Sequence, residues 1–304
     1  MDRVLCLLYH RVNPVKDDIY HLTISPDHFE EQVRYLKDHF PILRFEEDWT
    51  KPGGDGVVIT FDDGYADNYE YALPILEKYG IPAAIFISTG YVGSGREYWW
   101  DELARVLTKA VDYPRWFEWK DSLYHYRWDT HDQEARKDMI RSLHWILKLD
   151  PDVERANLWL EQIRQWAGIR SEARKENLPV DNLQLQELSR SPYITIGGHT
   201  VNHRSLGAQT KEGQQYEIGA SVRFLEKHLG KRIHIFSYPF GSAAHFNQDT
   251  FEVCSRKGIS KAATTVKGLW SSTCNPYAIP RVEVRDGNGA EFKRFLEECW
   301  RLGL

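Results

Sequence analysis

Two carboxylates stand side by side in this sequence, Asp62 and Asp63, directly after the apolar run VVITF at residues 57–61. A β-branched apolar run of this length predicts a buried strand, so both carboxylates are expected at a strand end. Adjacent side chains there need not point the same way. One can bind a cation while its neighbour faces a water molecule at that cation. An ordinary surface turn is the alternative, because Gly64 follows and Asp-Asp-Gly turns are common.

A pair of histidines, His199 and His203, is the second group with metal-binding chemistry. If the run HTVNH is locally helical, a spacing of four places both imidazoles on one face, with Cβ atoms about 5–6 Å apart. The run follows an apolar segment at residues 194–197, so it too is expected at a strand end. With 12 histidines in 304 residues, such a pair also arises by chance. One Asp and two His from two strand ends would suit zinc or another divalent ion with open coordination positions.

Two further strand ends carry candidate groups. The loop after residues 233–238 reads YPFG, and Tyr238, Pro239 and Phe240 form a rigid turn that could aim backbone N–H groups at a developing oxyanion. An ordinary turn is the alternative. His10 ends the first apolar run, where a histidine is usually structural, but near a metal-bound reactant it could protonate a leaving amine.

These groups must be positioned by the elements around them. Short apolar runs that are β-branched or aromatic, typical of buried parallel strands, occur at residues 4–9, 56–61, 83–87, 194–197, 233–238, 262–265 and 278–284. Helical patterns alternate with them. Such alternation favours an α/β fold, either a barrel or a doubly wound sheet.

The stretch from about residue 98 to 190 breaks this rhythm. It is polar, has helical periodicity and holds eight of the eleven tryptophans. We interpret the chain as one α/β barrel domain over residues 1–304 with a helical insertion at about residues 98–190. Insertions of this kind often shape substrate access, and a stabilising decoration is the alternative.

Composition excludes some classes of partner. The net charge is −5 and no basic block occurs, which argues against nucleic acid. No apolar stretch approaches the length of a transmembrane helix, and the first apolar run is too short for a signal peptide. Four scattered cysteines form no disulfide framework. We therefore expect a cytoplasmic protein.

The runs TFDDG at 60–64, HTVNH at 199–203 and YPFG at 238–241, in this order, resemble the polysaccharide deacetylase (NodB-like) family, carbohydrate esterase family four. The resemblance implies a distorted (β/α) barrel with seven or eight strands. It also implies Asp62 as catalytic base and a metal site made of Asp63, His199 and His203. One divalent ion is expected, zinc first, with cobalt, nickel or manganese as alternatives. A backbone N–H near Tyr65 would stabilise the oxyanion.

Two departures from the family pattern bear on the site. The third motif of the family often carries an arginine that pairs with the base, but Ser237 stands at that position here. Arg281, in the run IPRV, could supply the guanidinium from a neighbouring strand. The C-terminal Leu-x-x-His motif is also missing, yet LLYH at residues 7–10 has that pattern. This resembles a circularly permuted branch of the family and makes His10 the candidate general acid.

The resemblance implies hydrolysis of an N-acyl group, acetyl or formyl, on an amino sugar. The sugar could belong to a polysaccharide, a glycolipid or a sugar nucleotide, and the free acid and the sugar amine would be released. A non-catalytic carbohydrate-binding protein on the same barrel is one alternative, which Ser237 favours. A hydrolase of a non-sugar linear amide is the other.

Overall fold

The seven apolar runs of the sequence form one parallel sheet in the computed structural model, which describes residues 3–14, 18–50, 55–109, 111–120, 124–150 and 152–304. Its order is β10-β9-β8-β5-β4-β1-β11, and every neighbouring pair is parallel. The strands are β1 Val4–Tyr9, β4 Gly56–Phe61, β5 Ala83–Ile87, β8 Ile194–Gly198, β9 Ile235–Ser237, β10 Lys261–Ala263 and β11 Val282–Glu283. All seven predicted strands are therefore confirmed.

The sheet curls until its two edges approach the same segment of chain. Ile279 forms a parallel bridge with Ala263 of β10, and Val282, three residues later, pairs with Leu7 of β1. The fold is thus an incomplete seven-stranded (β/α) barrel rather than an open doubly wound sheet. The carboxyl ends of all its strands meet at one rim.

Side chains of the strands alternate between the inside of the barrel and the surrounding helices. On β1, Val4 and Cys6 pack in the interior with Val58 and Phe86, whereas Leu5 and Leu7 belong to the larger cluster that the helices cover. Trp270 and Trp49 extend the interior cluster. Both faces of the sheet are consequently apolar, which explains the uninterrupted apolar runs in the sequence.

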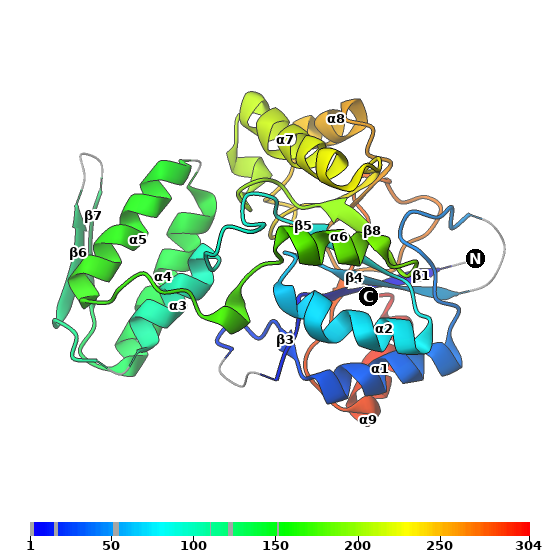
Figure 1. Ribbon diagram of the computed structural model, residues 1–304, viewed down its shortest axis with the longest axis horizontal. Coiled ribbons are helices and arrows are strands. Elements are labelled where there is room, and N and C mark those ends of the chain that lie inside the picture. Colours follow the sequence, from blue (N-terminus) through cyan, green and yellow to red (C-terminus); the bar gives the residue numbers. More distant parts are fainter. Residues whose placement is uncertain (1–2, 15–17, 51–54, 110, 121–123, 151) are drawn as a thin grey trace. The chain divides into compact units, whose positions relative to one another are not determined.

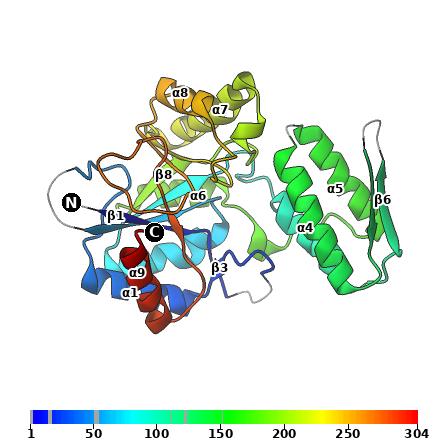
Figure 2. The same ribbon diagram turned by 180° about the vertical axis from the view of Figure 1, so that it is seen from behind.

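The helices cover the outer face of the curled sheet in separate groups, as Figures 1 and 2 show. Helix α1 packs against α2 and α9, and α7 packs against α8 and β8. Ser25 caps α1, and the left-handed Gly80 and Gly230 end α2 and α7. The bounds are α1 Pro26–His39, α2 Leu73–Tyr79, α6 Asn182–Arg190, α7 Lys211–Leu229, α8 Gln248–Arg256 and α9 Gly289–Leu302, with the short β2 Arg11–Val12, β3 Thr23–Ile24, η1 Asn68–Ala72 and η3 Leu206–Ala208.

Residues Arg96–Leu178 form a second compact unit, distinct from the barrel unit made of the rest of the chain. It holds α3 Trp99–Thr108, α4 Gln133–Leu149, α5 Val153–Ala167 and the short η2 Lys175–Asn177. It also holds an antiparallel hairpin, β6 Trp116–Lys120 and β7 His125–Asp129. The helices of the predicted insertion are confirmed, but the prediction missed the hairpin. The runs FEWK and HYRWD alternate aromatic and polar residues, a two-residue period typical of strands.

Among the described residues, no helix combines the length and the hydrophobicity that crossing a bilayer requires.

Candidate metal and catalytic site

Three strands deliver the predicted site residues to the same rim. Asp62 and Asp63 directly follow β4, His199 directly follows β8, and Ser237 is the last residue of β9. Because the carboxyl ends of parallel strands in a barrel face one way, residues far apart in sequence meet there.

Asp63, His199 and His203 lie close enough to hold one ion. One ligand atom from each falls within 4.8 Å of the other two, and all three residues are buried. The Nε2 atoms of His199 and His203 lie 3.4 and 3.2 Å from Oδ1 of Asp63. One carboxylate and two imidazoles are the donor set of many catalytic sites for divalent metals, with positions left for water and substrate. The residues therefore fit the divalent ion that the sequence predicted.

The tautomer of His199 suits a metal ligand. Its Nδ1 lies 2.8 Å from the carbonyl oxygen of Ser237. A carbonyl oxygen only accepts hydrogen bonds, so Nδ1 carries the proton and Nε2 keeps its lone pair. Burial also lowers the pKa of His203, more than the neighbouring Asp63 raises it. Both imidazoles are thus suited to bind a cation in their neutral form.

The segment that carries the two histidines is not helical, so the condition of a locally helical HTVNH is not met. Thr200 and His203 have positive φ angles of 64° and 51°. The turn is held by Glu217, a buried carboxylate of α7. Its Oε2 accepts hydrogen bonds from the N–H groups of Val201 and Asn202, both at 2.9 Å, and its Oε1 accepts from the Asn202 side chain at 2.8 Å. Sequence reasoning missed Glu217, since nothing in its local pattern distinguishes it from other helical glutamates.

Left-handed backbone is concentrated at this rim. Four of the five described non-glycine residues with positive φ lie in the predicted motifs, namely Asp63, Thr200, His203 and Phe240. Such conformations are unfavourable for residues with a Cβ and persist where surrounding contacts enforce them, often at functional sites. After Asp63, the chain needs a glycine: Gly64 has φ 83°, and a Cβ there would lie 2.6 Å from Cδ1 of Ile87.

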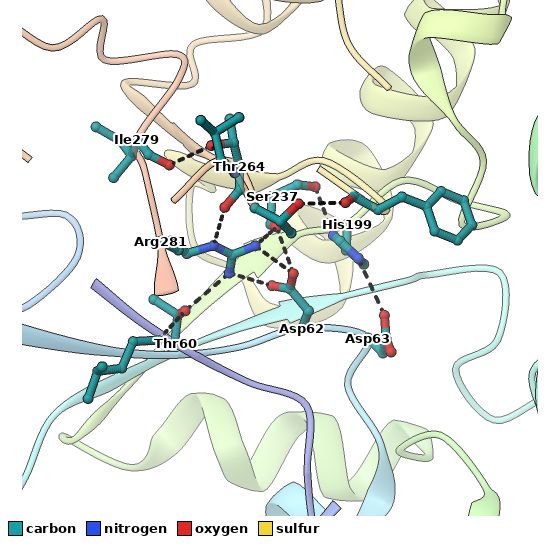
Figure 3. A network of polar contacts seen from close by, with 12 residues as sticks. Thr60, Asp62, Asp63, His199, Ser237, Thr264, Ile279 and Arg281 are labelled. Atoms are coloured by element: carbon teal, nitrogen blue, oxygen red, sulfur yellow. Dashed lines mark hydrogen bonds and ion pairs between the residues drawn. The ribbon is translucent and has the colours of Figure 1, made fainter. Parts of the chain in front are cut away.

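Arg281 places its guanidinium against Asp62, as Figure 3 shows. Two parallel hydrogen bonds of 2.8 and 2.6 Å join its terminal nitrogens to the two carboxylate oxygens. The other three N–H groups donate to Thr60 Oγ1, Ser237 Oγ and the Thr264 carbonyl oxygen, at 3.1, 2.8 and 2.8 Å. All five guanidinium donors are thereby used. Ser237 Oγ donates in turn to Asp62 Oδ2 at 3.1 Å. The serine at the family's arginine position therefore supports the ion pair between Arg281 and Asp62.

The charges of this network keep both aspartates ionised. Burial raises the pKa of Asp62, but the charge of Arg281 and its hydrogen bonds outweigh this, and the pKa falls below its usual value. Burial likewise raises the pKa of Asp63, but the contacts of its Oδ1 with the imidazoles of His199 and His203 outweigh this, and the pKa is lowered. The rim therefore offers one carboxylate to a cation and a second, separately oriented one to act as a base.

His10 lies beside Asp62. Tyr9 of β1 pairs with Phe61 of β4, and the Asp62 N–H donates to the Tyr9 carbonyl oxygen at 3.0 Å. The backbone here is held by the side-chain amide of Asn68, which donates to the His10 carbonyl oxygen at 2.9 Å. The next residue, Arg11, makes a buried ion pair with Asp67 at 2.8 Å. Half-buried His10 thus sits at the rim, on a segment fixed from both sides.

The YPFG loop contributes less than the sequence suggested. The N–H of Tyr238 continues the sheet by donating to the Ala263 carbonyl oxygen at 3.1 Å, and Pro239 has no N–H. The buried Tyr238 hydroxyl donates to the Tyr277 carbonyl oxygen at 2.9 Å. Neither residue therefore has a backbone N–H free for an oxyanion, because the Tyr238 N–H pairs with β10 and proline has none. A contact of these two residues with substrate stays a prediction.

Phe240 and Tyr65 do lie close to the metal-site residues. The Phe240 ring meets that of His203 edge to face, with centroids 4.7 Å apart. Tyr65, two residues after Asp63, has a buried ring with the Arg11 guanidinium 4.4 Å from its centre.

Comparison with known proteins gives consistent results. The model of the family described as polysaccharide deacetylase matches residues 50–149 and 165–262 of this chain. The chain is also similar to YxkH of Bacillus subtilis (strain 168), named as a candidate polysaccharide deacetylase, with 23% identity over 300 residues that cover 96% of this chain and 75% of YxkH.

A shorter region resembles an enzyme of named substrate. It is 32% identical over 146 residues to a poly-β-1,6-N-acetyl-D-glucosamine N-deacetylase of Staphylococcus aureus (strain MSSA476), covering 42% of this chain and about half, 48%, of that enzyme. Among solved structures, a deacetylase of Streptococcus pyogenes, PplD, in complex with acetate shares the fold. It has a TM-score of 0.61 and 18% identity, over 96% of this chain and 97% of that one.

Proposed function

The chain belongs to the polysaccharide deacetylase family, and from that premise we propose that it removes the acetyl group from N-acetylated amino sugars in a polysaccharide. The proposal is carried by the arrangement at the rim. A cation-binding group, Asp63 with His199 and His203, stands next to a carboxylate that Arg281 orients through both of its oxygens.

A divalent ion bound by Asp63, His199 and His203, zinc first and cobalt, nickel or manganese as alternatives, would polarise the amide carbonyl and lower the pKa of a bound water. Asp62 takes the proton of the water molecule whose oxygen attacks the carbonyl carbon. Arg281 keeps Asp62 ionised and correctly turned for this transfer.

The C–N bond then breaks, and His10 donates a proton to the departing nitrogen. Its place beside Asp62 brings donor and base to the same reacting group. A backbone N–H near Tyr65 stabilises the oxyanion of the tetrahedral intermediate, and Phe240 contacts the sugar next to His203. The products are acetate and the free amine of the sugar.

The substrate to test first is a β-1,6-linked N-acetylglucosamine polymer, because the Staphylococcus aureus relative is named for it. N-formyl sugars, glycolipids and sugar nucleotides form the rest of the panel. The non-catalytic alternative rested on Ser237 in place of an arginine. Arg281 provides the guanidinium that pairs with Asp62, so the serine at position 237 no longer favours a non-catalytic protein.

Metal content and acetate release should be measured together on the purified chain. We expect about one metal per chain and acetate release, both lost in His203→Ala, while Asp62→Asn keeps the metal and loses turnover. Asp62→Asn that retains turnover would refute its role as base. A wild-type chain that binds no divalent ion after these ions are added back would refute the proposal as a whole.

A further inference from the structure

The inserted unit, Arg96–Leu178, contains an open cleft of about 400 Å³ that the catalytic rim does not use. It is lined by residues of β7, α4 and α5 and of the turns beside them. The side chains on which the inference depends are two tyrosines, two tryptophans and an ion pair: Tyr124, Tyr126, Trp145, Trp159, Asp150 and Arg155. The volume lies in the range of small-ligand sites.

The aromatic rings of this cleft are exposed more than a core requires. Trp145 leaves 59% of its surface accessible and Tyr124 leaves 53%. Exposed aromatic rings gathered in one concave place mark binding sites rather than packing. The Trp145 ring also makes a cation–π contact, because the Lys148 ammonium lies 4.8 Å from its centre.

The wall behind the exposed rings is rigid. Trp159 is buried and stacks on Trp119, with ring centroids 3.8 Å apart and planes at 13°. Tyr124, Tyr126 and Trp128 alternate along the chain on one side of the hairpin. Successive rings are 5.8 and 5.4 Å apart and nearly parallel. These three rings thus form a row that starts just before β7 and continues along it, and Figure 1 labels this strand.

A polar pair completes the cleft. Arg155 binds Asp150 through two hydrogen bonds of 2.6 and 2.7 Å, which orient both groups at the edge of the rings. Flat apolar faces beside a fixed guanidinium and carboxylate match a pyranose sugar, whose C–H face is apolar and whose hydroxyls both donate and accept.

We propose that this cleft is a glycan-binding site, separate from the catalytic rim, that takes pyranose units of the polysaccharide on the rings of Trp145, Tyr124 and Tyr126. Its ligand is a stretch of sugar chain rather than a single reacting residue.

Calorimetric titration of the whole chain with a β-1,6-linked N-acetylglucosamine hexamer tests this directly. An Asp62→Asn background prevents hydrolysis during the titration. We expect Trp145→Ala to weaken binding about tenfold, with Tyr124→Ala in the same direction. Trp116→Ala is the matched control, because Trp116 is a 39% exposed tryptophan of the same hairpin outside the cleft. His203→Ala should keep the cleft binding.

Two outcomes of the titration would refute the proposed glycan site. They are an unchanged affinity for the hexamer in the Trp145→Ala/Tyr124→Ala double variant, and no binding of the hexamer at all. Self-association that Trp145→Ala abolishes, without hexamer binding, would assign the cleft to a second copy and also overturn it.

Activity separates this site from the catalytic proposal. With active enzyme, Trp145→Ala should raise KM for the polymer about tenfold and leave the rate on a short substrate unchanged. Binding that survives in a chain with no deacetylase activity would support the cleft and refute the proposed function. Activity without cleft binding would do the reverse.

Discussion

Replacement of Arg281 by lysine separates the charge of this residue from its geometry. Arg281 makes five hydrogen bonds, two of them to Asp62. A lysine ammonium has three donors on one nitrogen, so at least two of the buried acceptors lose their partner. Each unsatisfied buried acceptor costs about 1–3 kcal/mol, and we expect the free energy of unfolding to fall by about 2–6 kcal/mol.

The same substitution should lower kcat about a hundredfold, because general base catalysis depends on the position of the base. A lysine keeps a positive charge next to Asp62, so the carboxylate stays ionised and the acid limb of the pH profile should move little. Metal content should not change, since the five hydrogen bonds that Arg281 makes in the described part of the chain go to Thr60, Asp62, Ser237 and Thr264 and not to the metal group.

Steady-state acetate release, urea unfolding and metal analysis on the same preparation would measure these three quantities. Arg285→Lys is the control, because Arg285 is an exposed arginine whose contacts lie outside the site. A kcat within about threefold of wild type in a folded Arg281→Lys enzyme would refute the role given to this residue.

Three further substitutions test the supporting structure. Glu217→Ala should lower metal affinity about 10–100-fold, because the turn between the two histidines loses its hydrogen bonds to this carboxylate. Gln215→Ala on the same helix should leave metal affinity unchanged. If a metal titration gives Glu217→Ala the affinity of the wild type, Glu217 does not have this role. Gly64→Ala should destabilise the fold by about 1–3 kcal/mol in urea unfolding, because of its left-handed φ and the lack of room for a Cβ, and an unchanged midpoint would disprove the strain. Tyr238→Phe should cost about 1–2 kcal/mol of stability and leave kcat intact, while a large loss of kcat would restore Tyr238 to the catalytic site.

Residues next to apolar runs could be assigned from the sequence. Each of the seven strands is a short apolar segment, and the site residues Asp62, Asp63 and His199 follow such segments directly. In a parallel α/β fold, a strand end is a rim position whatever the rest of the chain does. This is why the metal group could be predicted before its geometry was known.

Local pattern failed where the backbone departs from regular structure. Residues 199–203 have a helical spacing of histidines, yet Thr200 and His203 adopt left-handed angles that Glu217 stabilises from α7. In residues 116–129 the two-residue period of aromatics indicated strands, but helical periodicity in the surrounding stretch obscured it. The spacing of two residues in the sequence gives their separation along the chain, but it does not specify the φ and ψ angles of the residues between them.

The sequence by itself determined the family, the strands and the residues able to bind a metal, because these depend on composition and on short-range order. Only the tertiary structure decided what surrounds them. Arg281 reaches Asp62 across 219 residues of sequence because the segment before β11 returns to the first strand of the barrel. The N–H of Tyr238 is not available to an oxyanion, because it donates to the carbonyl oxygen of Ala263 in β10. Partners of this kind are set by which strands become neighbours, and that is settled by the packing of the whole barrel.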